Sequence, residues 1–278
     1  MKIESLSERK RCRAAQRGMA SVFSTYRPIS HQPGRAAIRT IIQPANPGAY
    51  LRRLMAACFM ISVATSALSA PQDIAVPVGG TISTEGDSLT YGMDISPNGK
   101  STQINGATFT RSTNPYPEAL MTDLKGCATV VNRGFPGDRS VDGLVRWQNA
   151  PGANLVVMMY GSNDANDFGR SATGIVSPDV FTQVMQLMIT RRQAQGSTVM
   201  LLIPPPIEDR YFDGLIEPYR AEVRSLGKAM NLLVLDPKDA LSSVKSVFTF
   251  DHVHLSAAAN LAIAKAVASH IKCGGAKK

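Results

Sequence analysis

Short apolar runs alternate with longer amphipathic segments along the chain from about residue 80 onward. Five of the runs have the length of strands, and those that are apolar at successive positions are typical of strands buried on both faces. They predict strands at 80–86, 128–134, 154–161, 197–206 and 232–236. The amphipathic segments predict helices at 115–124, 140–150, 177–196, 218–230 and 255–271.

This regular alternation indicates a parallel sheet whose crossover helices cover both faces. The sequence therefore predicts one α/β/α sandwich with a five-stranded parallel sheet over residues 80–272, without internal repeats or a second domain. A linker at 71–79 precedes this domain, and a C-terminal tail at 273–278 follows it. Ligands bind at the carboxyl ends of the strands in such sheets, so the residues that follow each strand are the candidates for chemistry.

The net charge of +9 comes entirely from the amino-terminal part of the chain. Residues 1–54 hold 11 Lys and Arg against two acidic residues, whereas the remaining 224 residues hold 19 of each sign. A domain without excess positive charge is not expected to have a nucleic-acid partner.

An arginine pair, Arg52 and Arg53, precedes the apolar run 54–70, which ends in small residues. A positive flank, a short apolar core and a small-residue end predict a secretory signal peptide cleaved near 67–70, and hence a secreted or periplasmic protein. The run is short for a membrane span, so membrane contact is expected only during export. An uncleaved anchor is the alternative. The long segment before the run is unusual for a signal peptide, and initiation at Leu51 would explain it.

Export changes what the four cysteines imply. Cys127 and Cys273 would remain in the mature chain, an even pair in an oxidising compartment. This favours a disulfide between them. Two unrelated buried thiols are the alternative.

Four short polar segments after expected strands or before the last helix contain the groups that ester hydrolysis needs. Ser88 is a candidate nucleophile, and Asp251 and His254, three residues apart in a loop, are a candidate acid and base. The Gly137 backbone N–H and the Asn163 amide are candidate donors to an oxyanion. Each segment alone is more often an ordinary turn. Their joint occurrence, in an order that supplies every role, favours catalysis.

The same segments resemble the sequence blocks of the GDSL or SGNH hydrolases, a superfamily of esterases, lipases and carbohydrate deacetylases. EGDSLTYG carries Ser88 at the nucleophile position, VVNRGFPGD carries the oxyanion glycine Gly137, YGSND carries the oxyanion Asn163, and DHVHLS carries Asp251 and His254. The resemblance covers about residues 80–271 and implies the flavodoxin-like SGNH hydrolase fold. It also implies an acyl-Ser88 intermediate, an oxyanion held by the Ser88 and Gly137 N–H groups and the Asn163 amide, and no metal or cofactor.

One departure from the family pattern bears on the choice of base. His252 stands where glycine is common in the family, and it could be mistaken for the base. Its neighbour two positions on, His254, has the three-residue spacing from Asp251 that the resemblance requires.

Two loops bear on the substrate. The stretch 92–114 contains 11 Ser, Thr, Asn or Gln residues, and a polar rim with Tyr91 and Tyr116 nearby suits a hydroxylated substrate. A solvated loop without a substrate role is the alternative. The second loop, 204–214, follows an expected strand and should border the same crevice. Its charged and aromatic side chains are expected to contact substrate or to form a surface ion cluster: Glu208, Arg210 and Tyr211.

Together these patterns predict an exported serine esterase that removes short acyl groups, such as acetyl, from a small-molecule or saccharide ester. A lysophospholipase, lipase or thioesterase would use the same catalytic residues and differ in the depth of the pocket. A non-catalytic glycan-binding module is the alternative of another class. A nucleotide-binding protein is disfavoured, because no glycine-rich phosphate loop follows a strand.

Overall fold

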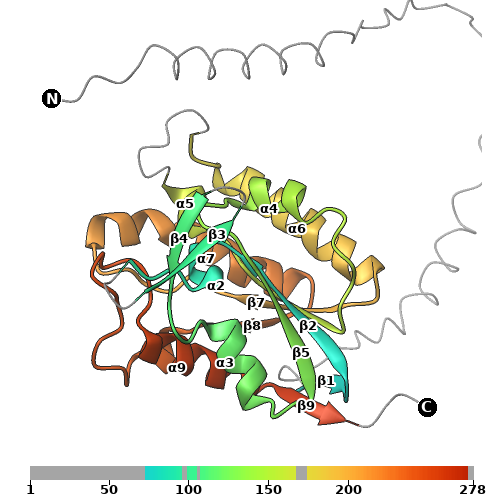
Figure 1. Cartoon of the computed structure of the whole chain (residues 1–278). Coiled ribbons are helices and arrows are strands. Elements are labelled where there is room, and N and C mark those ends of the chain that lie inside the picture. Colours follow the sequence, from blue (N-terminus) through green and yellow to red (C-terminus); the bar gives the residue numbers. More distant parts are fainter. Residues whose placement is uncertain (1–72, 96–98, 105–106, 167–173, 275–278) are drawn as a thin grey trace, which may run out of the picture. The chain divides into compact units, whose positions relative to one another are not determined.

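The computed structural model describes residues 73–95, 99–104, 107–166 and 174–274 (Figure 1). The predicted basic extension and signal peptide, residues 1–70, lie outside the described residues. Five strands form a parallel sheet in the order β5-β2-β6-β7-β8, which confirms the predicted fold class. Their bounds are Gly80–Gly86 for β2, Ala128–Gly134 for β5, Leu155–Met159 for β6, Thr198–Leu202 for β7 and Leu233–Leu235 for β8.

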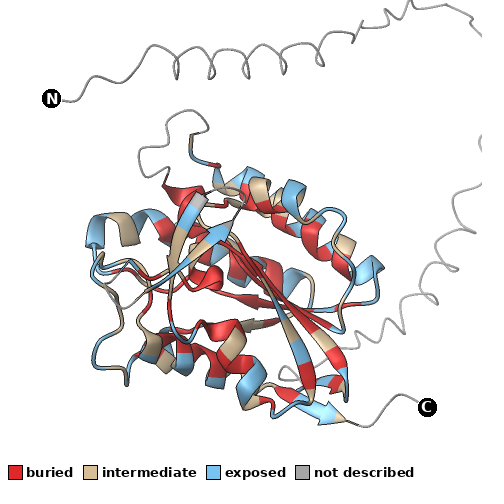
Figure 2. Cartoon of the chain, viewed as in Figure 1, coloured by how far each residue is buried: buried red, intermediate tan, exposed pale blue. Residues whose placement is uncertain are grey.

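The sheet lies between two layers of helices. Successive residues of the central strand β6 enter opposite cores, because side chains alternate between the faces of a strand. Leu155 and Val157 pack in one core, and Val156 and Met158 pack in the other. Burial therefore concentrates along the central strands and the inner faces of the helices (Figure 2).

The first core is covered by α3 and α9 and the second by α4, α6 and α7 (Figure 1). Their bounds are Tyr116–Asp123 for α3, Ser140–Arg146 for α4, Pro178–Ala194 for α6, Arg210–Ala229 for α7 and Ala257–Ala268 for α9, and a short α8, Lys238–Leu241, adjoins α9. No helix in the described part of the chain has the length and apolar character needed to cross a membrane.

Helix α7 begins eight residues before the expected start of its segment at 218. Asp209 caps it by accepting hydrogen bonds from the backbone N–H groups of Tyr211, at 2.8 Å, and Phe212, at 3.1 Å. Pro218, the first residue of the expected segment, lies inside the helix. The second half of the expected 204–214 loop is therefore helical.

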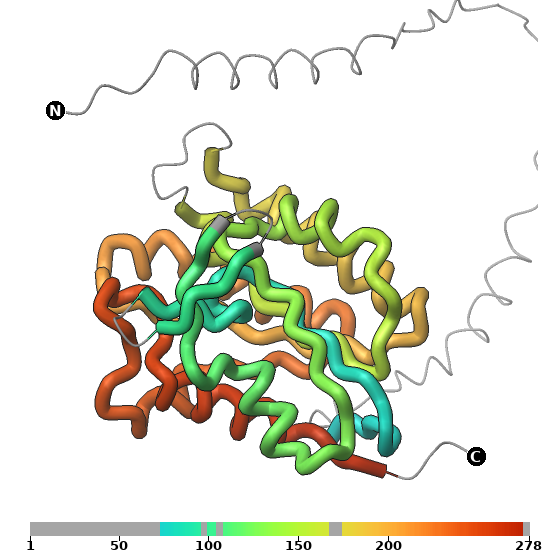
Figure 3. The backbone as a smooth tube through the Cα atoms, in the orientation of Figure 1, coloured from blue at the N-terminus to red at the C-terminus, as the bar shows by residue number. Residues whose placement is uncertain are grey.

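The stretch 92–114, expected to be a loop, contains a β-hairpin. Strands β3 (Lys100–Ile104) and β4 (Ala107–Arg111) pair antiparallel, and the hairpin follows the short helix α2 (Ser88–Tyr91). In the tube of Figure 3 the hairpin and α2 lie at the same end of the sheet. The sequence did not indicate these strands, because most residues of this stretch are polar and form no apolar run.

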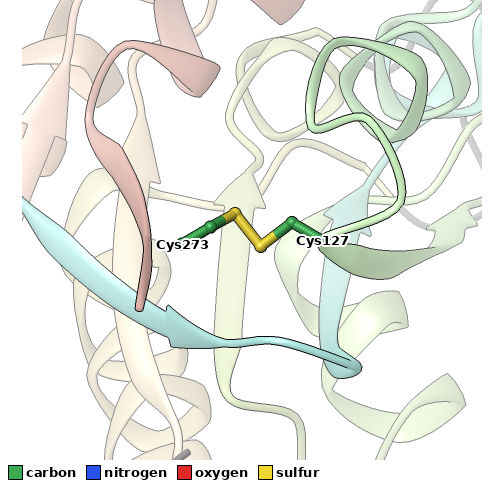
Figure 4. The surroundings of a disulfide bond; sticks show 2 residues. All are labelled: Cys127 and Cys273. Carbon is green, nitrogen blue, oxygen red and sulfur yellow. A yellow bond between two sulfur atoms is a disulfide. The ribbon is translucent and has the colours of Figure 1, made fainter. Parts of the chain in front are cut away.

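The opposite end of the molecule carries a second small sheet. Strand β1 (Ile74–Pro77) pairs in parallel with β9 (Ile271–Gly274), so the predicted linker at 71–79 and the predicted tail at 273–278 are both wrong in part. The physical reason is the burial of the side chains of Ile74 and Val76 in the first core. Cys127 and Cys273, the pair for which the sequence predicts a disulfide, are bonded with a Cα–Cα distance of 6.1 Å (Figure 4).

Candidate active site

Ser88 lies where strand β2 ends and α2 begins. The Asp87 carboxylate accepts a hydrogen bond of 2.8 Å from the Leu89 backbone N–H and caps this short helix. As the first residue of α2, Ser88 lies at the carboxyl end of the sheet, and its Oγ is 2.8 Å from Nε2 of His254. The two groups are 166 residues apart in sequence, and the fold brings them into hydrogen-bonding contact.

Asp251 and His254 lie on a narrow loop that precedes α9. The Ser256 N–H donates to the Val247 carbonyl at 2.8 Å, and the Thr249 N–H donates to the His254 carbonyl at 2.7 Å. These bonds close the loop in the manner of a hairpin and hold the side chain of His254 against Ser88.

The Asp251 carboxylate is fixed by four hydrogen bonds. Its Oδ1 accepts from the backbone N–H of His254 at 2.9 Å, the N–H of Val253 at 3.1 Å and the Thr249 hydroxyl at 2.9 Å. Its Oδ2 contacts Nδ1 of His254. Partial burial acts to raise the pKa of Asp251, but the bonds from His254 and Val253 and the charge of His254 outweigh it and hold the pKa well below the usual range. The carboxylate therefore stays ionised and orients the imidazole with Nε2 toward Ser88.

Gly137 and Asn163 reach the site from two further turns. Gly137 has φ of 85° and Gly161 has φ of 130°, values that only glycine adopts readily. Gly161 caps the short helix α5 (Ser162–Ala165), which carries Asn163 after β6. The Asn163 amide donates to the Asp138 carbonyl at 3.1 Å and to Asp87 Oδ2 at 3.3 Å, so α5 is tied to both neighbouring turns.

Two buried carboxyl groups, those of Asp87 and Asp164, lie close enough for their charges to interact, and Asp87 accepts from the Asn163 amide. Burial raises the pKa of Asp87 to about 7, against the lowering effects of the Leu89 N–H and of His254. Burial also raises the pKa of Asp164 to about 6, although Ser140 donates to it from both its N–H and its hydroxyl. A protonated Asp87 places no negative charge beside Asn163, which favours an oxyanion at that position.

All five residues of the predicted constellation line one cavity of about 390 Å³. They are Ser88, Gly137, Asn163, Asp251 and His254. Most of the remaining wall is apolar and is formed by Leu89, Met93, Phe109, Pro136 and Val253. These side chains are not predicted from the sequence to line the site. The stretch 92–114 thus supplies two apolar side chains, Met93 and Phe109, to this wall rather than the expected polar rim.

Phe109 belongs to the wall because of the hairpin. On β4 its ring packs edge-on against Phe135, with 6.1 Å between centroids, and against Tyr91 at 6.2 Å. A phenylalanine between two threonines in a polar stretch was the signal in the sequence. This signal indicates a wall residue only if the segment is a strand with alternating faces, and the sequence predicts a loop here.

The two tyrosines predicted to contact the substrate are packed inside the protein. Tyr116 is fully buried in the first core at the start of α3. Tyr91 is 5% exposed, and the Arg111 guanidinium lies over its ring at 4.8 Å. Both predictions are wrong, because the rings stabilise the packing of the residues that follow Ser88 and do not line the cavity.

The 204–214 segment does not line this cavity either. Arg210 and Tyr211 lie exposed in the first turn of α7, whose cap turns them outward, and Glu208 pairs with His252 on the outer side of the catalytic loop. The predicted contacts of these three side chains with a substrate at Ser88 are therefore not seen.

Comparisons with known proteins identify the family of this chain. The sequence model of the GDSL-like lipase/acylhydrolase family matches residues 86–262, which is more than half of the chain. No match was found among curated proteins.

Solved structures with the same fold include three that are 21–23% identical to this chain. An α/β hydrolase enzyme from the metagenome of Lake Arreo, Spain, is 23% identical with a TM-score of 0.56, over 70% of this chain and 95% of that one. An acetylxylan esterase from Geobacillus stearothermophilus is 21% identical with a TM-score of 0.57, over 72% and 96%. A lipase/acylhydrolase from Enterococcus faecalis is 22% identical with a TM-score of 0.54, over 71% and 100%.

The matched region begins just before Ser88 and ends after His254, so it contains every member of the constellation. The chain therefore belongs to the GDSL-like lipase/acylhydrolase family and is a hydrolase of ester bonds.

Proposed function

We propose that the protein is an exported serine esterase that removes short acyl groups, such as acetyl, from a polar or saccharide substrate. The observation that carries the mechanism is the continuous chain of contacts from Ser88 Oγ to His254 Nε2, at 2.8 Å, and from His254 Nδ1 to Asp251. It supplies a nucleophile, a base and a group that orients the base.

In the first step, Ser88 Oγ attacks the ester carbonyl carbon while His254 Nε2 accepts the hydroxyl proton. The carbonyl π electrons move to oxygen and form an oxyanion. Its collapse breaks the bond to the alkoxy oxygen, and His254 returns the proton to the departing alcohol. Asp251 remains a carboxylate and stabilises the imidazolium between the two transfers.

In the second step, water attacks the acyl-Ser88 carbonyl and His254 accepts its proton. The second oxyanion collapses, Ser88 Oγ leaves and regains a proton from His254, and the carboxylic acid is released. We assign the stabilisation of both oxyanions to the Ser88 and Gly137 N–H groups and the Asn163 amide. In the structure the two N–H groups of the Asn163 amide donate to the Asp138 carbonyl and to Asp87 Oδ2, so one of these bonds must give way when the amide donates to an oxyanion.

The cavity supports a compact substrate. Its volume of about 390 Å³ exceeds what an acetyl group fills, so part of the alcohol is enclosed as well. The likeness of the fold to an acetylxylan esterase supports an acetylated saccharide. The apolar wall around Phe109 favours the rival of a longer acyl chain, as in a lysophospholipase, lipase or thioesterase.

A series of p-nitrophenyl esters from acetate to decanoate separates the two. A short-acyl esterase has its highest kcat/KM with acetate or butyrate and loses activity steadily as the chain lengthens. A maximum at octanoate or decanoate assigns the protein to the rival class. Absence of hydrolysis across the whole series contradicts the proposed function.

Export is supported by the arginine pair at 52–53 and the apolar run that follows it. The Cys127–Cys273 disulfide fits an oxidising compartment. N-terminal sequencing of protein recovered outside the cytoplasm should find a mature chain that begins near residue 71. A full-length chain retained inside the cell contradicts export.

A further inference from the structure

The β3–β4 hairpin is anchored to the helix that carries the nucleophile. The backbone turns at Gly92, directly after α2, and the Ser112 N–H donates to the Gly92 carbonyl at 2.8 Å. The Arg111 guanidinium donates from Nε to the Tyr91 carbonyl at 2.7 Å. The base of the hairpin is therefore held against the end of α2, a few residues from Ser88.

Phe109 extends from this hairpin into the wall of the catalytic cavity, and among the described residues that line the cavity it alone is aromatic. Its ring packs edge-on against two other rings, at an interplanar angle of 66° to Tyr91 and 71° to Phe135. Each of these rings lies under a guanidinium, that of Arg111 at 4.8 Å from the Tyr91 centroid and that of Arg146 at 3.5 Å from the Phe135 centroid. Edge-to-face and cation–π contacts are both favourable, so the Phe109 ring is fixed in position.

The same packing reaches the turn of the oxyanion glycine. Phe135 lies two residues before Gly137 in the sequence. Arg146, whose guanidinium lies over Phe135, also donates to both oxygens of the Asp138 carboxylate, at 2.7 and 2.8 Å. Phe109 therefore packs against a turn that is itself tied down, and it cannot move aside for a longer substrate chain without disturbing that turn.

The other apolar side chains of the wall differ from Phe109 in ways that matter for selectivity. Met93 is unbranched and flexible, so it adapts to what it contacts. Val253 belongs to the catalytic loop, beside His254. Because His254 returns the proton to the departing alcohol, this loop lies next to the alcohol. Phe109 is thus the large, fixed side chain that the hairpin contributes.

The apolar character of this wall matches the acyl group rather than the alcohol. The proposed alcohol is polar, and hydroxyl groups placed against Met93, Phe109 and Pro136 would lose hydrogen bonds to water without gaining partners. An acyl chain has no polar atom beyond its carbonyl. Its methylene groups therefore gain free energy from burial against the same side chains.

We propose that Phe109 ends the space for the acyl group and thereby limits the length of the chain that the esterase accepts. The β3–β4 hairpin is then the element that sets acyl selectivity. The inference rests on the proposed function and names the residue that excludes longer acyl chains. A smaller side chain at this position extends the space for the acyl group, and a larger one shortens it.

The test uses two ratios of kcat/KM that report on different parts of the substrate. The acyl ratio compares p-nitrophenyl octanoate with p-nitrophenyl acetate, and the alcohol ratio compares hexyl acetate with ethyl acetate. Each methylene that becomes covered should raise kcat/KM by roughly fourfold, so room for about two of them raises the acyl ratio on the order of tenfold in Phe109→Ala. The acyl ratio should rise less in Phe109→Leu and fall in Phe109→Trp. The alcohol ratio should keep its wild-type value in all three variants.

Thr108→Ala is the matched control. Thr108 is the exposed neighbour of Phe109 on β4, its side chain points to the opposite face of the hairpin, and it is not among the residues that line the catalytic cavity. The control should leave both ratios unchanged. If Phe109→Ala does not fold, the opposite shifts expected in Phe109→Leu and Phe109→Trp decide the outcome.

Three results overturn the inference: an unchanged acyl ratio in the folded Phe109 variants, a change in the alcohol ratio in place of the acyl ratio, or an equal shift in Thr108→Ala. In each case, hydrolysis by the wild type that is lost in Ser88→Ala upholds the proposed function. A wild type that hydrolyses none of the four esters overturns the proposed function and the inference together.

Discussion

The two ends of the central sheet are built in different ways. At the amino end, β1 and β9 pair, Ile74 and Val76 are buried, and the Cys127–Cys273 bond joins segments 146 residues apart. At the carboxyl end lie short helices, a strained histidine and carboxyl groups with shifted pKa values. We therefore expect changes at the first end to affect mainly stability and changes at the second end to affect mainly activity.

The largest effect is expected at the carboxyl end. Ser88→Ala and His254→Ala each remove a member of a group that acts as a unit, and kcat should fall by roughly 10⁴-fold or more. The thermal midpoint should stay within a few degrees, because neither side chain supports a core. Steady-state hydrolysis of p-nitrophenyl acetate measures kcat, and a melting curve measures the thermal midpoint. Substantial activity in His254→Ala would show that another group is the base.

The amino end should give the reverse result. The double variant Cys127→Ser with Cys273→Ser frees a loop of about 150 residues, and the free energy of unfolding should fall by about 2–5 kcal/mol. Its kcat at a temperature where it is folded should stay within about twofold, because the bond is far from Ser88. Denaturant titration and kinetics test this pair of outcomes. A loss of kcat without a loss of stability contradicts the division between the ends.

Asp87 adds a pH dependence of stability at the carboxyl end. Its folded-state pKa is about 7 against 3.8 for an ordinary aspartate, so the folded state holds the proton more tightly. The free energy of unfolding therefore falls as pH rises from about 4 to about 7, and the loss persists above that range.

Asp87→Asn keeps a cap for α2 and removes the titration. The gain in melting temperature over the wild type should be larger at pH 8 than at pH 5, by on the order of 5 °C. Melting curves at the two pH values give the comparison. A gain that does not depend on pH would show that Asp87 is ionised throughout.

The smallest effect is expected at His252. His252→Gly relaxes the left-handed backbone and should raise the free energy of unfolding by up to about 1 kcal/mol. Hydrolysis of ethyl acetate should remain close to that of the wild type, since Nε2 of His254 is the group in contact with Ser88. Loss of this activity would assign His252 a role in the chemistry.

The strands and the candidate site are predictable from the sequence where local signals coincide with the global fold. Strands β2 and β5 have the predicted bounds, because each is a short run that ends at glycine next to a catalytic segment. The site residues could be named together because four polar segments follow the strands in a fixed order. The geometry that joins Ser88 to His254 then follows from the parallel sheet.

The missed features depend on partners that are distant in sequence. Strands β1 and β9 have four residues each, and their pairing spans nearly the whole domain. The β3–β4 hairpin is polar at most positions, and the one signal for a wall residue, Phe109 between two threonines, is too short to indicate a strand. Tyr116 and Tyr211 look alike in sequence, yet one is fully buried and the other is 71% exposed. Burial of this kind is decided by packing rather than by local pattern.

The central claim is that Ser88 is the nucleophile of an ester hydrolase. Labelling with a fluorophosphonate probe, followed by mass spectrometry of the labelled peptide, tests it most directly. The wild type should carry the probe on Ser88 alone, and Ser88→Ala should carry none. Equal labelling of the two proteins, a label on another residue, or no label on the active wild type would contradict the account.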